Sequence, residues 1–273
     1  MCTMKKKFQM IGFALSVLLV TLPIVTVGAD NAASGKQKKE KTTESALGVK
    51  PVTGSWINLA YKDVRNKYTN PQSFDNMDPK LWEAKVRELS AMGIEYLVLM
   101  EVANEGKSYY PSQIMPWWYN KDKKSPVDAI LDEAAKHNMK IFMSSGWAKD
   151  QDDNLLDPAI KERQLQIMEE LASLYKNHKA FYGWYLPVED CLCPIFAEHA
   201  VQSVNTLSEK AKKLAPGKKT LISPYGIGLS EFDNPEYEKQ MQKLKVDIIA
   251  YQDEVGCVRD QFTLPRLKKN WQR

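Results

Sequence analysis

Acidic residues follow an aromatic, strand-like segment at positions 183–190, with the sequence GWYLPVED. Two carboxyl groups on either side of a glycosidic bond suffice to hydrolyse it, because one protonates the leaving oxygen and the other attacks the sugar or activates water. Glu189 is the predicted general acid/base. Nearby Trp184 and Tyr185 are expected to raise its pKa by excluding water, whereas Asp190 is expected to face solvent or the next loop.

Asp253 is the predicted catalytic partner of Glu189, since it follows a later strand-like segment directly after Gln252. A separation of about 5–5.5 Å between the two carboxyl groups would favour a retaining mechanism, and about 6.5–9.5 Å an inverting one. The sequence leaves both open. His137 and His178 precede strand-like segments instead of following them, which argues against histidine-based catalysis.

Polar and aromatic side chains also lie near the ends of the other predicted strands. Sugar rings offer C–H faces for aromatic stacking and hydroxyl groups for hydrogen bonds, so this combination indicates a carbohydrate ligand. Glu101 could instead pair with Lys107 in its own loop. The predicted substrate-binding residues are Trp56, Asn58, Glu101, Trp117, Trp118, Trp147, Tyr185, Tyr225 and Gln252.

Trp117 and Trp118 form an aromatic cluster with Tyr119 in an otherwise polar loop. Such a cluster would expose much apolar surface unless a ligand or a packing partner covered it. Trp56 and Trp184 lie inside predicted strands and could equally fill the inside of a barrel or the layer between sheet and helices.

Six strand-like segments alternate with helical patterns along the chain. Several of them are almost continuously apolar, which is typical of strands buried on both faces of a parallel sheet. Asp78-Pro79, Ser125-Pro126 and Asp157-Pro158 each mark a helix start with an N-cap residue followed by proline. Two further helices are expected at about 196–214 and 235–244. The predicted strands are 54–60, 95–101, 139–145, 180–186, 219–224 and 246–252.

This alternation fits an open doubly wound sheet or a (β/α)8 barrel. No Gly-x-Gly-x-x-Gly motif follows the first strand, so the barrel is favoured over a nucleotide-binding sheet. Six units fit the sequence, whereas a complete barrel needs eight. The predicted fold is therefore α/β, of the (β/α)8 TIM-barrel type, truncated after about six βα units. Exposed edge strands would follow from such a truncation.

The N-terminal 51 residues differ in composition from the rest of the chain of 273 residues. A basic start and the apolar run 8–27 predict a secretory signal peptide at 1–29, or an uncleaved membrane anchor as the alternative. Residues 30–51 predict a flexible spacer rich in Lys, Ser and Thr, and residues 52–273 a barrel domain. We therefore expect a secreted or periplasmic protein that meets the membrane only if the signal remains uncleaved.

The formal net charge of +4 comes from the N-terminal part, since residues 51–273 hold 30 basic and 31 acidic residues. Such a near-neutral domain lacks the basic surface that nucleic-acid binding requires. No cofactor is expected. Cys191-x-Cys193 with His199 is a weak zinc pattern, so no metal is predicted, and the cysteines are expected to be inert or to include one disulfide from Cys257 to Cys191 or Cys193.

Several motifs resemble the glycoside-hydrolase-like TIM-barrel family catalogued as domain of unknown function 4434, found in secreted bacterial proteins. They are GSWIN, ELSAMGIEYLVLMEV, YYPS, LDEAAKHNMKIFMSSGW, FYGWYLPVED and DIIAYQDEVG, and the likeness covers about residues 52–260. The resemblance implies a sugar-active barrel without naming a substrate. It places Glu189 as the acid after the fourth strand, and Gln252 and Asp253 after the sixth. Such barrels continue into a seventh strand, where another glutamate is expected.

Three functions remain open from the sequence. The first is a secreted glycoside hydrolase that uses carboxylate acid/base catalysis on a polysaccharide or glycan. The second is a carbohydrate-binding protein that has kept the aromatic residues without turnover. The third is an inactive, truncated barrel whose second catalytic carboxylate lies in a missing seventh strand.

Overall fold

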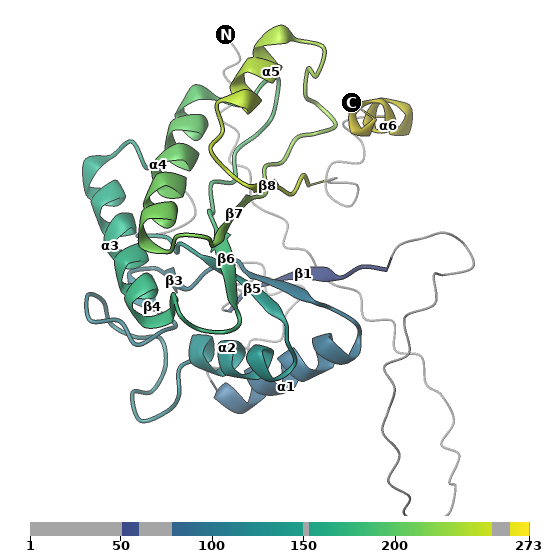
Figure 1. Cartoon of the computed structure of the whole chain (residues 1–273). Helices are drawn as coiled ribbons and strands as arrows, with labels where there is room; N and C mark the ends of the chain where they lie inside the picture. Colours follow the sequence, from purple (N-terminus) through teal and green to yellow (C-terminus); the bar gives the residue numbers. More distant parts are fainter. Residues whose placement is uncertain (1–50, 60–77, 150–152, 253–262, 273) are drawn as a thin grey trace, which may run out of the picture. The chain divides into compact units, whose positions relative to one another are not determined.

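A computed structural model describes residues 51–59, 78–149, 153–252 and 263–272. Six parallel strands form one sheet in the order β1-β2-β5-β6-β7-β8, which is curved like part of a barrel (Figure 1). The predicted class is therefore confirmed as a partial (β/α) TIM barrel with six strands in the described residues. The strands are Gly54–Ile57 (β1), Tyr96–Leu99 (β2), Lys140–Ser144 (β5), Phe181–Tyr185 (β6), Lys219–Ile222 (β7) and Ile248–Ile249 (β8).

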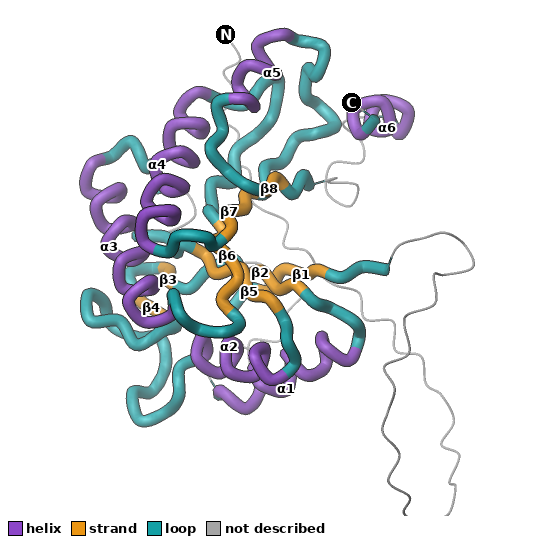
Figure 2. Tube along the Cα trace, viewed as in Figure 1, coloured by secondary structure: helices purple, strands orange, loops and turns teal. Residues whose placement is uncertain are grey.

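A helix follows each of these six strands. The helices are Pro79–Ala91 (α1), Pro126–Lys136 (α2), Pro158–Tyr175 (α3), Glu198–Leu214 (α4), Pro235–Gln242 (α5) and Leu264–Trp271 (α6). The helices α1 to α4 lie along the outside of the sheet, as the colouring by secondary structure shows (Figure 2). The last helix, α6, contacts the segment after β7 through Asn270 and Arg266. A short hairpin after β2, with strands Ala103–Asn104 (β3) and Lys107–Ser108 (β4), is not predicted from the sequence. Among the described residues, no helix combines the length and apolar character needed to cross a membrane.

Proline starts three of these helices as the sequence predicts. Asp78, Ser125 and Asp157 are the N-caps, and each side chain accepts a hydrogen bond from a backbone N–H in the first turn. These bonds satisfy amide groups that the helix itself leaves free, while proline fixes the backbone where no N–H is needed. Local sequence therefore fixes the residues at which the helices that follow β1, β2 and β5 begin.

A β-bulge interrupts the pairing of β5 with β6. Ile141 pairs with Phe181, but the next residue, Phe142, pairs with Gly183, so β6 holds one extra residue there. An inserted residue changes which side chains of a strand point to each face of the sheet. Gly183 allows the close approach, because an added Cβ would lie 2.5 Å from the carbonyl oxygen of Lys219 and 2.8 Å from the Phe142 ring.

Neighbouring strand residues alternate between the two faces of a sheet, and the bulge decides which face Trp184 and Tyr185 each take. Trp184 is fully buried in the core that includes helix residues, where it packs edge-to-face on Phe181 with ring centroids 5.1 Å apart. Tyr185 is equally buried, but it lies in a separate cluster of strand residues on the inner face, with Val98 and Phe142. The alternatives left open for Trp184 are thus resolved in favour of the layer between sheet and helices.

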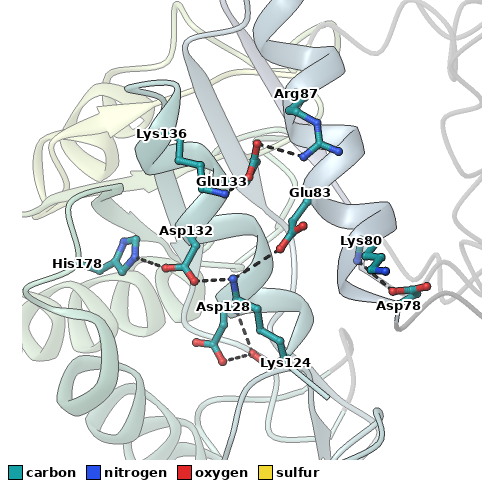
Figure 3. A network of polar contacts seen from close by, with 11 residues as sticks. Asp78, Lys80, Glu83, Arg87, Lys124, Asp128, Asp132, Glu133, Lys136 and His178 are labelled. Atoms are coloured by element: carbon teal, nitrogen blue, oxygen red, sulfur yellow. Dashed lines mark hydrogen bonds and ion pairs between the residues drawn. The ribbon is translucent and has the colours of Figure 1, made fainter. Parts of the chain in front are cut away.

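An ionic network joins α1 to α2 outside the sheet (Figure 3). The buried carboxylate of Glu133 accepts bonds from Lys136 at 2.6 Å and from Arg87 at 3.2 Å, and His137 lies 3.2 Å away. Bonding to Lys136, followed by Arg87 and His137, lowers the pKa of Glu133 to about 2 against the opposing effect of burial. Lys124 extends the network to Glu83 of α1.

We expect Gly183→Ala to destabilise the fold by about 1–3 kcal/mol, because its methyl group would clash with the backbone of β7 and with the Phe142 ring. Gly54→Ala is the matched control, since its Cβ would lie at an ordinary 3.7 Å from Tyr96. Urea unfolding of both variants measures the difference. Equal stability of the two variants would contradict the assigned role of the bulge.

We expect Glu133→Gln to lower the free energy of unfolding by about 1–2 kcal/mol at pH 7, since it leaves cationic partners without their carboxylate. The lowered pKa of Glu133 means that its stabilisation is complete above the unfolded pKa of about 4.3 and is lost as the pH falls towards about 2. Unfolding at pH 2–7 should therefore show a weaker acid dependence for the variant.

The control for this experiment is Glu88→Gln, which removes an exposed partner of Lys85 on the same helix layer. Exposed pairs of this kind contribute little to stability. A Glu133→Gln variant that unfolds with the same acid dependence as the wild type would show that the network does not hold α1 and α2 together.

Candidate active site

A cavity of about 480 Å³ lies beyond the carboxyl ends of β5 and β6. Its walls come from the loops after these two strands, from Gln164 of α3 and from α4 residues between His199 and Leu207. This volume lies within the range of small-molecule sites, and the carboxyl ends of barrel strands are where such sites form. Its lining includes Trp147, Asp153, Gln164, Glu189, Asp190 and His199.

Glu189 is anchored by the last residue of β6. The Tyr185 hydroxyl donates a hydrogen bond of 2.7 Å to Glu189 Oε1. Tyr185 is fully buried, and the Trp56 side chain also hydrogen-bonds to it. Trp56 pairs with Val98 across β1 and β2, so it belongs to the inner face of the sheet with Tyr185. Of the predicted binding residues, Tyr185 therefore contacts the predicted acid, and Trp56 contacts Tyr185.

Two opposing effects act on the pKa of Glu189. Burial raises it because a carboxylate loses hydration there, whereas the bond from Tyr185 lowers it by stabilising the charged form; burial is the larger effect, and the pKa is raised overall. The predicted direction is thus confirmed, but its cause needs correction. Trp184 lies on the other face of the sheet, and the direct contribution of Tyr185 opposes the shift.

Asp190 points towards the start of α4. Its Oδ2 lies 2.7 Å from His199 Nε2, and its Oδ1 accepts the backbone N–H of Cys191 at 2.7 Å. The neighbouring carboxyl groups of Glu189 and Asp190 thus have different partners, a buried phenol and an exposed imidazole. This difference supports the choice of Glu189 over Asp190 as the proton donor.

Gln164 of α3 is a cavity residue that the sequence analysis missed. It is buried, and its Nε2 donates to Ser145 O at 2.9 Å and to Ser145 Oγ at 3.1 Å, with a further bond to Gly146 O. These bonds hold the loop after β5, which carries the predicted binding residue Trp147. The Trp147 indole N–H lies 3.4 Å from Pro187 O in the loop after β6. A polar residue on an otherwise apolar helix face was the available signal.

Glu101 and Asn58 lie near the ends of β2 and β1. Glu101 is buried and accepts a bond of 2.9 Å from Asn104 Nδ2. The Lys107 ammonium lies 4.3 Å from the centre of the Trp118 ring. Asn58 Oδ1 is buried without a hydrogen-bond partner among the described residues.

Tyr225 and Gln252 follow the next two strands. Tyr225 forms an isolated β-bridge with Cys191. Gln252 Nε2 donates to Ser223 O at 2.8 Å, which ties the end of β8 to the end of β7. Neither residue lines the cavity of Glu189. Asp253, the predicted catalytic partner, lies outside the described residues, as does Cys257.

Trp117 and Trp118 have packing partners within their own loop. Trp117 stacks on Tyr119 with centroids 5.0 Å apart, and its indole N–H donates to Ser112 O at 2.7 Å. Trp118 stacks on Tyr109 at 6.1 Å, and its N–H donates to Asn104 O at 3.1 Å. Both side chains are half-buried, so their presence in a polar loop is explained without a ligand.

Cys193 is an exposed free thiol, and its backbone N–H donates to Cys191 Sγ at 3.2 Å. Within the described ranges, no group of three or more His, Cys, Asp or Glu side chains is arranged to hold a metal ion. The disulfide to Cys257 stays a prediction because that residue lies outside these ranges.

Comparisons with solved structures support the barrel. A crystal structure of a putative alpha-L-fucosidase from Bacteroides thetaiotaomicron superposes with a TM-score of 0.58 and 19% identity, over 82% of this chain and 70% of that one. Identity at this level shows the fold alone. No match was found among curated proteins.

Two further structures have TM-scores below 0.5 and add no argument. A beta-galactosidase from Halorubrum lacusprofundi gives 0.47 at 12% identity, over 70% of this chain and 41% of that one. A beta-galactosidase from Marinomonas ef1 gives 0.46 at 10% identity, over 73% and 40%. The present chain thus spans less than half of either protein.

A family match covers most of the domain. Residues 52–272 match the family described as Domain of unknown function (DUF4434), which agrees with the resemblance carried by the strand-end motifs. The chain therefore belongs to this family, and its described residues form six strands of a glycoside-hydrolase-like TIM barrel.

Proposed function

We propose that this protein is an exported glycoside hydrolase in which Glu189 protonates the leaving oxygen of a glycan. The observation that carries the proposal is a half-buried carboxyl group, bonded to the buried Tyr185 hydroxyl and with a raised pKa, at the wall of a cavity of about 480 Å³. A general acid must hold its proton near the working pH, and burial is the usual means of achieving this for a glutamate.

The surroundings of Glu189 suit a sugar. Trp147 supplies an aromatic side chain to the cavity, and Asp153, Asp190 and His199 supply polar groups for hydroxyl hydrogen bonds. The solved structure that shares the fold is named as a putative alpha-L-fucosidase, which supports a glycan as the class of substrate but does not identify the substrate of this chain.

Export is proposed from the apolar segment 8–27 and the small residues Gly28 and Ala29 that follow it. N-terminal sequencing of the mature protein tests this proposal.

Hydrolysis needs a second carboxylate. Asp253 remains the proposed partner from the sequence, as nucleophile or as base for water. Asp153 is the alternative within the described residues, because it lines the same cavity. Its Oδ2 accepts the Lys149 backbone N–H at 2.7 Å. The variants Asp253→Asn and Asp153→Asn separate the two assignments. Only the variant at the true catalytic partner should lose turnover as Glu189→Gln does.

We expect Glu189→Gln to lower kcat by about 10²–10⁴-fold on any glycan that the wild type cleaves, because an amide cannot donate the proton. A screen against a glycan panel followed by initial rates on the best substrate measures the effect. Glu209→Gln is the control, since this exposed carboxylate pairs with Lys245 on the outer helix layer. Wild-type rates for Glu189→Gln on every cleaved glycan would rule out the proposed role.

A further inference from the structure

A second cavity, of about 340 Å³, lies at the opposite end of the sheet. It is formed where β5, β6 and β7 begin, whereas Glu189 follows the end of β6. Its lining combines four lysines with aromatic side chains and contains no acidic residue. The lysines are Lys140, Lys179, Lys218 and Lys219, and the aromatic residues are Phe181 and Tyr182.

None of the four lysines forms a salt bridge with another described residue. Their hydrogen-bond partners are neutral: Lys140 donates to the Tyr96 hydroxyl at 2.8 Å, and Lys179 donates to Asn138 Oδ1 at 3.2 Å. Lys218 donates to the carbonyl oxygen of Phe181. Each ammonium group has three donors, so donors remain for a ligand.

Lys218 is the lysine of this cavity that an anion would stabilise most. It is half-buried, its ammonium lies 5.2 Å from the centre of the Phe181 ring, and burial lowers its pKa. A cation that has lost hydration gains more from a bound anion than an exposed cation does. The nearest acidic influences lie outside the cavity: Glu95 acts on Lys140, and Asp247, bonded to Thr220, interacts with Lys219.

The rest of the cavity is suited to an oxyanion with an organic body. The Lys140 ammonium lies 5.3 Å from the centre of the Tyr182 ring, so charge and an aromatic face meet at one wall. Lysine binds phosphate and sulfate groups as a point charge with movable donors. We propose that this cavity is a binding site for an oxyanion group, phosphate or sulfate, either free or carried on a sugar, separate from the site of Glu189.

The test is isothermal titration calorimetry of the full chain with three probes: inorganic phosphate, glucose 6-phosphate and glucose. We expect glucose 6-phosphate to bind with 1:1 stoichiometry, and Lys218→Gln and Lys219→Glu each to weaken it by at least about tenfold, since each removes a charge-assisted contact. Lys219 is exposed, so its variant keeps the fold even if Lys218→Gln does not.

The control is Lys161→Ala, an exposed lysine of α3 that lines neither cavity, and it should bind like the wild type. Equal affinity for phosphate and glucose 6-phosphate identifies a free oxyanion as the ligand, and tighter binding of the sugar phosphate identifies a sugar-borne one; both support the site. Binding of glucose alone, no binding of either phosphate, or equal losses in Lys161→Ala would overturn it.

A second readout locates the ligand. Amine labelling followed by mass spectrometry should show that glucose 6-phosphate protects Lys218 and Lys219 but leaves Lys161 unchanged. Unchanged labelling of all three lysines under saturating ligand would place the bound phosphate elsewhere and contradict the proposal.

Discussion

The hydrogen bond from the Tyr185 hydroxyl to Glu189 is the contact on which the candidate site depends. It exists because the bulge at Gly183 turns Tyr185 to the inner face of the sheet and sends Trp184 into the layer beneath the helices. Without the extra residue, regular alternation would exchange the two faces, so that Trp184 would lie on the inner face and Tyr185 beneath the helices. A single glycine in β6 therefore connects the packing of the sheet to the position of the predicted acid.

The two ends of the sheet present opposite chemistry. At the carboxyl end, Glu189, Asp190 and Asp153 line a cavity with few basic side chains, while lysines surround the cavity at the amino end. Burial raises the pKa of Glu189 in the first setting, whereas burial lowers the pKa of Lys218 in the second. The near-neutral composition of the domain thus does not reveal that acidic and basic side chains line cavities at opposite ends of the sheet.

Much of the fold could be predicted from the sequence, because its signals are local. The pairs Asp78-Pro79, Ser125-Pro126 and Asp157-Pro158 mark helix starts by capping and by fixed backbone angles, and the structure confirms all three. Glu189 was also accessible, since it follows a strand. Gln164 and the faces of Trp184 and Tyr185 were not, because they depend on a bulge and on contacts between distant segments.

The most direct test of this account is a ¹³C NMR titration of the Glu189 carboxyl group, assigned with Glu189→Gln, in the wild type and in Tyr185→Phe. We predict a pKa above that of an exposed glutamate, because burial dominates, and a further rise in Tyr185→Phe, because the variant removes the bond that stabilises the carboxylate. A wild-type pKa at or below that of an exposed glutamate, or a fall in Tyr185→Phe, would contradict the assignment of Glu189 as a proton donor whose pKa is set by partial burial and by Tyr185.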